Sequence, residues 1–154
     1  MQRSIRRADR ALTNEQAIEI LHVGEYGILS TVSQDGQPYG VAVSFSYAGN
    51  AIFFHCAIEG HKLDNLASNP RVSFCVVGKT EVLPNKFATR YESTIVFGKT
   101  CELTGDEKKL GLIELLKKYS PDFMEKGERY IDSDIKKTRV FKIEIESLSG
   151  KARR

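Results

Sequence analysis

The sequence predicts a mainly β protein with flanking helices, in which six antiparallel strands close into a barrel. Bulky and small or polar side chains alternate with a period of two through most of the stretch 27–56, which is typical of half-buried strands. Turn-forming pairs at Asp35-Gly36 and Gly49-Asn50 interrupt that stretch, so consecutive strands are joined by tight antiparallel turns. Strands of this kind avoid exposed edges by closing into a barrel. The pattern differs from the strand–helix alternation of a parallel α/β protein.

A short helix is expected before the first strand. Thr13-Asn14-Glu15-Gln16 has the spacing of a capping box, with Thr13 as the N-cap and Gln16 reaching back to it. Ala17, Ile20 and Leu21 then mark one apolar face, and Gly24 is expected to end the helix.

Three strands follow, at 27–32, 39–47 and 51–56. The second strand alternates between bulky and small side chains, and the bulky set is expected to face a core. The small set would leave a flat surface against which a wide molecule could lie. The bulky set is Tyr39, Val41, Val43, Phe45 and Tyr47, and the small set is Gly40, Ala42, Ser44 and Ser46.

The second half of the chain is expected to supply the remaining strands and most of the helices. Gly98 marks a bulge or a close backbone approach within a long strand. Ser120-Pro121 predicts the start of a helix that stops near Gly127. The expected elements are a helix at 62–67, strands at 72–77 and 91–103 separated by a loop at 78–90, a helix at 106–118, the helix after Pro121 and a last strand at 139–145.

The 154 residues are expected to form one domain, with a basic N-terminal arm at 1–12 and a short C-terminal tail at 148–154. The net charge of +3 permits an anionic ligand without demanding nucleic acid. No apolar run approaches the roughly 20 residues of a membrane helix, and no apolar segment follows the basic N-terminus. We therefore expect a cytoplasmic protein, with Cys56, Cys75 and Cys101 as reduced thiols.

Several classes of site are disfavoured by the motifs. The chain has no Gly-x-Ser-x-Gly elbow, Walker loop or Rossmann glycine fingerprint. Its three histidines and three cysteines lack pairwise metal-ligand spacing, so no metal site is expected.

The stretch from Phe53 to Lys62 concentrates polar chemistry where a strand stops and a helix starts. The first N–H groups of a helix lack internal partners and lie at the positive end of its dipole, so such a junction favours anions. Lys62 would add a full positive charge there. The junction alone predicts a small molecule that carries a phosphate.

Each of these residues also has an ordinary structural interpretation. Lys62 could be a solvated helix lysine, His55 a core histidine satisfied by the backbone, and His61 simply exposed. Cys56 fits a buried small hydrophobic residue better than a reactive thiol.

Taken in order, several segments resemble the pyridoxamine 5′-phosphate oxidase-like, FMN-binding split β-barrel family, and within it the nitroimidazole-resistance (NimA-like) branch. The resemblance spans roughly residues 5–147. The segments that carry it are Gly27-Ile28-Leu29-Ser30-Thr31, Asp35-Gly36-Gln37-Pro38-Tyr39, Ile52 to Ala57, Glu59 to Asp64, Asn69 to Phe74 and Tyr91 to Gly98.

The resemblance implies a homodimer with FMN at the subunit interface. The flavin phosphate would be held by Lys62 of the Gly60-His61-Lys62 turn, and the partner subunit would reach in around Tyr91 to Thr94. His55 would lie near the flavin and is the candidate catalytic residue. The cofactor-binding candidates are Tyr39, Val41, Ala42, Ser44, His55, Cys56, Ala57, His61, Lys62, Tyr91, Ser93 and Thr94.

The leading hypothesis is therefore an FMN-dependent oxidoreductase that reduces a small organic substrate such as a nitroaromatic, with electrons from a nicotinamide cofactor or another donor. The alternative is a non-catalytic module that binds flavin, haem or deazaflavin. Pyridoxamine phosphate oxidase proper is disfavoured, because only Lys151-Ala152-Arg153-Arg154 remains for the basic C-terminal set of that enzyme. A nucleic-acid-binding β-barrel is disfavoured because no strand face combines aromatic and basic residues.

Overall fold

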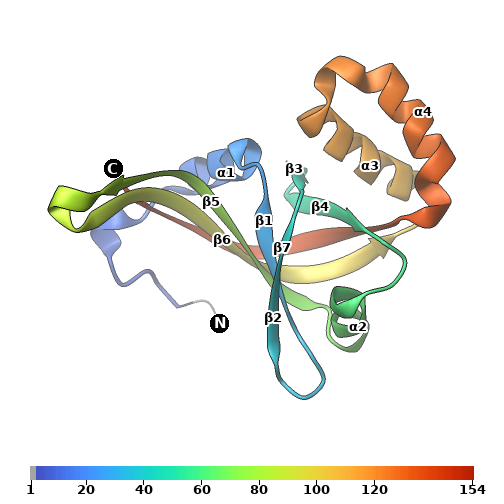
Figure 1. Cartoon of the computed structure of the whole chain (residues 1–154). Coiled ribbons are helices and arrows are strands. Elements are labelled where there is room, and N and C mark those ends of the chain that lie inside the picture. The colour runs from blue at the N-terminus through green and yellow to red at the C-terminus, as the bar shows by residue number, and fades with distance from the viewer. Residues whose placement is uncertain (1–2) are drawn as a thin grey trace.

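The computed structural model describes residues 3–154 and is built on one antiparallel sheet of seven strands. The strand order is β2-β1-β5-β6-β7-β4-β3. Figure 1 shows the sheet curling strongly, with the helices α3 (Gly105–Tyr119) and α4 (Met124–Asp134) at one end and the hairpin of β5 and β6 reaching away at the other. The strands are β1 (Gly27–Val32), β2 (Pro38–Val43), β3 (Ser46–Ala48), β4 (Ala51–Cys56), β5 (Arg71–Leu83), β6 (Ala88–Leu103) and β7 (Arg139–Arg153).

The prediction of six strands closing into a barrel is wrong in number and in closure. The sheet is open, with β2 and β3 at its two edges. These edges are consecutive in the chain and are joined by only Ser44 and Phe45, so the sheet must curl to bring them together. The expected strand 39–47 is thus split, because Phe45 and Ser46 are both buried there and the period-two alternation breaks. We call the boundary between edge strand β2 and the β3–β4 hairpin, beside which Ser44 and His55 lie, the edge seam.

The β5–β6 hairpin is longer than expected. Residues 78–90, predicted as a loop, continue both strands outward and turn through the 3-10 helix η2 (Pro84–Lys86). The predicted tail at 148–154 is also strand, because β7 pairs with β6 as far as Tyr91 opposite Arg153. In the predicted N-terminal arm, residues 1–2 lie outside the described residues; η1 (Ala8–Arg10) and a bridge from Ala11 to Lys151 tie the rest to β7.

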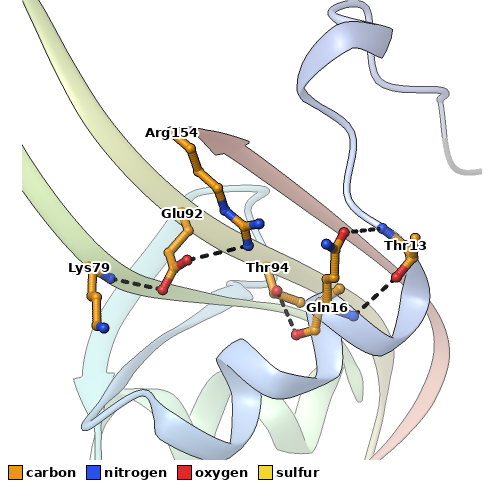
Figure 2. A network of polar contacts seen from close by, with 7 residues as sticks. Thr13, Gln16, Lys79, Glu92, Thr94 and Arg154 are labelled. Atoms are coloured by element: carbon orange, nitrogen blue, oxygen red, sulfur yellow. Dashed lines mark hydrogen bonds and ion pairs between the residues drawn. The ribbon is translucent and has the colours of Figure 1, made fainter.

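Helix α1 (Asn14–Val23) is anchored as its sequence predicts. The capping box is present: Gln16 N–H donates to Thr13 Oγ1 at 3.3 Å, and Thr13 N–H donates to Gln16 Oε1 at 3.0 Å. The buried hydroxyl of Thr94 donates to the Ala17 carbonyl at 2.8 Å and fixes the helix to β6 (Figure 2). Nearby, Glu92 Oε1 accepts a hydrogen bond from the Lys79 backbone N–H, and Glu92 Oε2 lies 4.0 Å from Arg154 Nη2 (Figure 2).

The core fills the concave side of the sheet under α1 and α2 (His61–Ser68). Its largest fully buried side chains include Phe45, Phe54 and Phe74. Leu63 and Leu66 insert from α2, while Ile20 and Leu21 insert from α1. Burial of apolar surface contributes about 25 cal/mol per Å², and this contribution holds the two helices on the sheet.

Two further helices, α3 (Gly105–Tyr119) and α4 (Met124–Asp134), form a pair beside β4, linked to each other through η3 (Pro121–Phe123), with η4 (Ile135–Lys137) leading into β7. The prediction that the last helix stops near Gly127 is wrong, since α4 continues to Asp134. Gly127 instead permits close packing, because a Cβ atom there would overlap the side chain of Leu116. Leu115 and Ile131 are the buried anchors of the pair.

Candidate functional site

The polar junction after β4 is formed by an uncapped helix N-terminus. Gly60, the N-cap of α2, has φ +149° and ψ 168°, a combination that essentially only glycine adopts. No side chain of the described chain caps this first turn. The N–H groups of Leu63 and Asp64 donate to the Gly60 carbonyl at 3.0 and 3.2 Å, which leaves those of His61 and Lys62 for a ligand. A Cβ atom added at Gly60 would meet nothing within 4 Å, which shows open space beside the turn.

Lys62 and His61 occupy this first turn, as predicted. The His61 ring stacks on the Tyr39 ring of β2, with centroids 4.1 Å apart and planes inclined by 31°. Three of the predicted residues are therefore brought together at the edge of the sheet. A positive side chain, free amides and a flat aromatic pair at one place suit an anionic group attached to a ring.

Two residues that the sequence reasoning missed hold α2 in this position. The buried Asn65 side chain donates to Thr31 Oγ1 at 2.9 Å, and Thr31 Oγ1 donates to the Tyr39 carbonyl at 3.5 Å. The chain of bonds connects α2 to β1 and β2. A polar residue between Leu63 and Leu66 on the buried face of the helix was the available signal, since buried amides need partners.

His55 lies near the end of β4, and its side chain reaches the edge seam. It lines a cavity of about 450 Å³ together with Ser44, which follows β2 on the other side of the seam. The residue is exposed, yet the atoms around its ring still desolvate it; this burial, reinforced by the charge of Lys62, lowers the pKa of His55. The imidazole is therefore neutral at neutral pH and can donate one hydrogen bond and accept another.

Cys56 points to the opposite face of β4 and is buried. Burial raises the pKa of its thiol, which keeps the sulfur protonated and unreactive. Ala57, which follows, is exposed at the start of the loop to α2.

The outward face of β2 is flat, as predicted. Gly40, Ala42 and Ser44 are exposed, whereas Val41 and Val43 pack against the core. Only the backbone of Val41 is therefore available on the outward face. The small side chains leave a surface that a planar ring could approach closely.

The three candidates on β6 lie apart from Lys62 within one chain, because β1 and β5 separate β6 from β2 in the sheet. Tyr91 and Ser93 lie on the outward side, with the exposed Ile95 and Phe97. Thr94 points inward, is fully buried and uses its hydroxyl on α1, so its side chain does not share the outward side with Tyr91 and Ser93.

The helix pair adds lining residues to the cavity beside His55 that the sequence reasoning did not single out. They include Tyr119, Tyr130 and Asp134. The Tyr119 hydroxyl accepts from the Phe45 N–H at 2.9 Å and donates to the Glu25 carbonyl at 2.6 Å, which ties α3 to the edge seam. Sequence spacing could not reveal this, since Phe45 and Tyr119 are 74 residues apart.

Other kinds of site are not seen in the part of the chain that the structure describes. Residues 3–154 hold no group of three or more His, Cys, Asp or Glu side chains that could bind a metal ion. Among the same residues, no helix is both long and apolar enough to cross a membrane.

Comparisons with known proteins place this geometry in a family. The model of the pyridoxamine 5′-phosphate oxidase family matches residues 13–152. No curated protein sequence matches the chain.

Solved structures share the fold at low sequence identity. A candidate 5-nitroimidazole antibiotic resistance protein from Bacteroides thetaiotaomicron has a TM-score of 0.76 at 19% identity, with 92% of this chain and 86% of that chain covered. A FAD-binding protein from Mesorhizobium loti has a TM-score of 0.67 at 23% identity, covering 94% and 98%. A FAD- and haem-binding protein from Mycobacterium smegmatis has a TM-score of 0.81 at 19% identity, covering 92% and 72%.

The family match extends over nearly the whole chain, and the neighbours agree with it in fold. The chain belongs to the pyridoxamine 5′-phosphate oxidase family.

Proposed function

We propose that this protein is a homodimeric flavoprotein that binds FMN and uses it to reduce a small organic substrate. The observation that carries the proposal is the uncapped N-terminus of α2, where Lys62 lies beside the Tyr39–His61 ring pair. Neighbours of the same fold described as binding FAD support a flavin over other phosphate-bearing molecules.

The described residues fit FMN in three respects. The free amides of the α2 turn and Lys62 would hold the phosphate, and the open space at Gly60 would admit it. The outward face of β2 would support the ring, and Ser44 would donate to its edge. When bound, FMN supplies the hydride and electron transfer.

The chain itself would hold and orient the reactants. The neutral His55 imidazole, which lines the cavity, would donate a hydrogen bond to the substrate from one ring nitrogen and relay a proton to it while the other ring nitrogen takes up a proton from water. For a nitroaromatic the balanced reaction is R–NO2 + NAD(P)H + H+ → R–NO + NAD(P)+ + H2O, with two electrons transferred.

Dimerisation completes this proposal. On the outward face of β5 and β6, Val77 is 48% exposed and Ile95 and Phe97 are each 41% exposed. Cys75 pairs with Ile95 and Val77 with Ser93, so these side chains form one continuous face, which we call the outer β5–β6 face. A second copy packed there would cover the apolar side chains and bring its own Tyr91 and Ser93 toward the flavin.

The phosphate contact is tested by comparing FMN with riboflavin, which lacks the phosphate. Replacing Lys62 by alanine should weaken FMN binding by about tenfold to a hundredfold, the range for a hydrogen bond to a charged group. Riboflavin binding should not change. Lys86→Ala, in the exposed η2 turn, is the matched control. Equal loss of both ligands, or no loss of FMN, would remove Lys62 from the site.

Catalysis is tested separately by His55→Gln in the FMN-loaded protein. We expect turnover of a nitroaromatic with NAD(P)H to fall by about a hundredfold, as for loss of a group that transfers protons, with flavin retained. Unchanged turnover would remove His55 from the reaction. Turnover that is absent with every donor and substrate, including pyridoxamine phosphate, would leave a flavin-binding module.

A haem-binding module is the second candidate, and His55 favours it. A neutral imidazole beside an apolar cavity could bind the iron of a haem through its unprotonated ring nitrogen. Haem titration of the wild-type chain and of His55→Gln tests this, since binding of the iron by His55 predicts a haem spectrum that the substitution abolishes.

A further inference from the structure

The cavity beside His55 lies between the sheet and the α3–α4 pair, and its walls differ in chemistry. His55 and Ser44 come from the sheet side, at the edge seam. The helices supply apolar side chains, namely Leu112, Leu115, Leu116, Ile131 and Ile135. A volume of about 450 Å³ is in the range of small-molecule sites, and mainly apolar walls with a few polar groups are typical of them.

The helix pair is held firmly enough to define this space. Gly111 of α3 packs close to Leu103 and Val140, where an added Cβ atom would lie 3.1 Å from each side chain. An ion pair of 2.8 Å between Lys109 and Asp132 joins α3 to α4. The cavity walls therefore come from packed elements and not from a loose flap.

Of the described residues that line the cavity, Asp134 is the one acidic side chain, and no lysine or arginine lies among them. Asp134 Oδ1 accepts from the Ser133 hydroxyl at 3.1 Å, and within the described residues no other donor bonds to the carboxylate. The carboxylate at the end of α4 thus keeps capacity to bind a ligand.

Aromatic groups complete the lining. The Tyr119 hydroxyl is already occupied by Phe45 and Glu25, and Lys118 Nζ lies 5.5 Å from the centroid of its ring, so Tyr119 forms a wall of the cavity and leaves the contact with a cation to Tyr130. Tyr130 is 68% exposed and lies at the solvent side of the cavity. An aromatic ring and a carboxylate together attract a cation carried by an apolar body.

We propose that this cavity selects the substrate and takes a compact aromatic molecule with a positively charged amine, held by Asp134. The inference rests on the proposed function, since it places the reacting group of that molecule near His55. It adds the substrate class and assigns the choice of substrate to the α3–α4 pair.

The test is a set of three nitrobenzenes of nearly equal size: 4-nitrobenzylamine, 4-nitrotoluene and 4-nitrobenzoate. Isothermal titration of the wild-type protein should show tightest binding for the amine and weakest for the benzoate. The preference for the amine over 4-nitrotoluene should be about tenfold or more, as for a charge-assisted hydrogen bond. Asp134→Asn should abolish that preference with little effect on 4-nitrotoluene.

Glu128→Gln is the matched control, because it removes the same charge from an exposed position of the same helix outside the cavity and leaves the Lys109–Asp132 ion pair intact. It should keep the preference for the amine. Ile135→Trp, which fills the cavity, should weaken all three compounds. Equal affinities in the wild type, a preference that survives Asp134→Asn, or one that Glu128→Gln also abolishes would overturn the proposal.

The titrations are run on flavin-free protein and again after loading with FMN. If no FMN is retained but the amine still binds through Asp134, the proposed function fails and the pocket assignment stands. If FMN is retained and the three compounds bind alike, the pocket assignment alone fails.

Discussion

His55 and Lys62 are linked electrostatically at the end of β4, and this makes the site sensitive to pH. Burial and the Lys62 charge both disfavour the imidazolium, so the pKa of His55 lies below its usual value of 6.5. We predict that NMR titration of Lys62→Ala will show this pKa raised toward 6.5, while Lys86→Ala leaves it unchanged. An unaltered His55 titration in Lys62→Ala would show that the two groups are not coupled.

The lowered pKa of His55 also determines how this residue changes the stability of the protein with pH. Because the unfolded chain binds the proton on His55 more readily than the folded chain, His55 makes the protein less stable as pH falls through about 6.5 toward its lower folded pKa. Above that window the ring is neutral in both states, and His55 makes no pH-dependent contribution.

Whether a contact at the site could be predicted from the sequence depends on how far apart its two residues lie along the chain. Gly60, His61 and Lys62 could be found because one short junction contains the glycine, the basic side chains and the helix start. Asn65 with Thr31, and Tyr119 with Phe45, could not be paired in advance, since their contacts depend on how the sheet curls. The inward direction of Thr94 likewise follows from strand pairing and not from the motif around it.

At the scale of elements, the bulge in β6 depends on Gly98. The pairing of β6 with β7 shifts register between Phe97 and Gly98, and a Cβ atom at Gly98 would overlap the carbonyl of Glu144. We predict that Gly98→Ala lowers the free energy of unfolding in urea by about 1–3 kcal/mol, as for overpacking. Gly40→Ala, on the outward face of edge strand β2, should change it by no more than about 0.5 kcal/mol. Equal effects of the two substitutions would show that the bulge needs no glycine.

Local signals predicted most elements correctly. The capping box began α1, Gly24 ended it, and the turns at Asp35-Gly36 and Gly49-Asn50 joined the strands. The failures have a common cause, which is long-range pairing. Residues 78–90 and 148–153 carry polar side chains with little apolar alternation, and they form strands because their backbones pair with each other and with β6.

For the whole molecule, the separation of β6 from the α2 junction makes a second subunit necessary for the proposed site. We predict a dimer by light scattering at micromolar concentration, with twice the chain mass of 17.3 kDa. Ile95→Glu would bury an unpaired charge in the outer β5–β6 face and should raise the dissociation constant by about a hundredfold or more. Leu110→Glu, at an exposed position of α3, should leave the dimer intact. A wild-type monomer would contradict this assembly.

An antiparallel sheet was predicted correctly, because alternating strands with tight turns leave few other arrangements. The open edges of the sheet were not predicted, because the burial of both Phe45 and Ser46 breaks a strand that alternation alone would continue. That break creates the edge seam, to which His55 and Ser44 contribute.

The most direct test of the central claim is the visible absorption spectrum of the purified chain after addition of FMN and removal of the excess by gel filtration. We predict retained flavin bands at a stoichiometry near one FMN per chain. A protein that leaves the column without flavin, although folded, would contradict the assignment of the α2 junction as an FMN site.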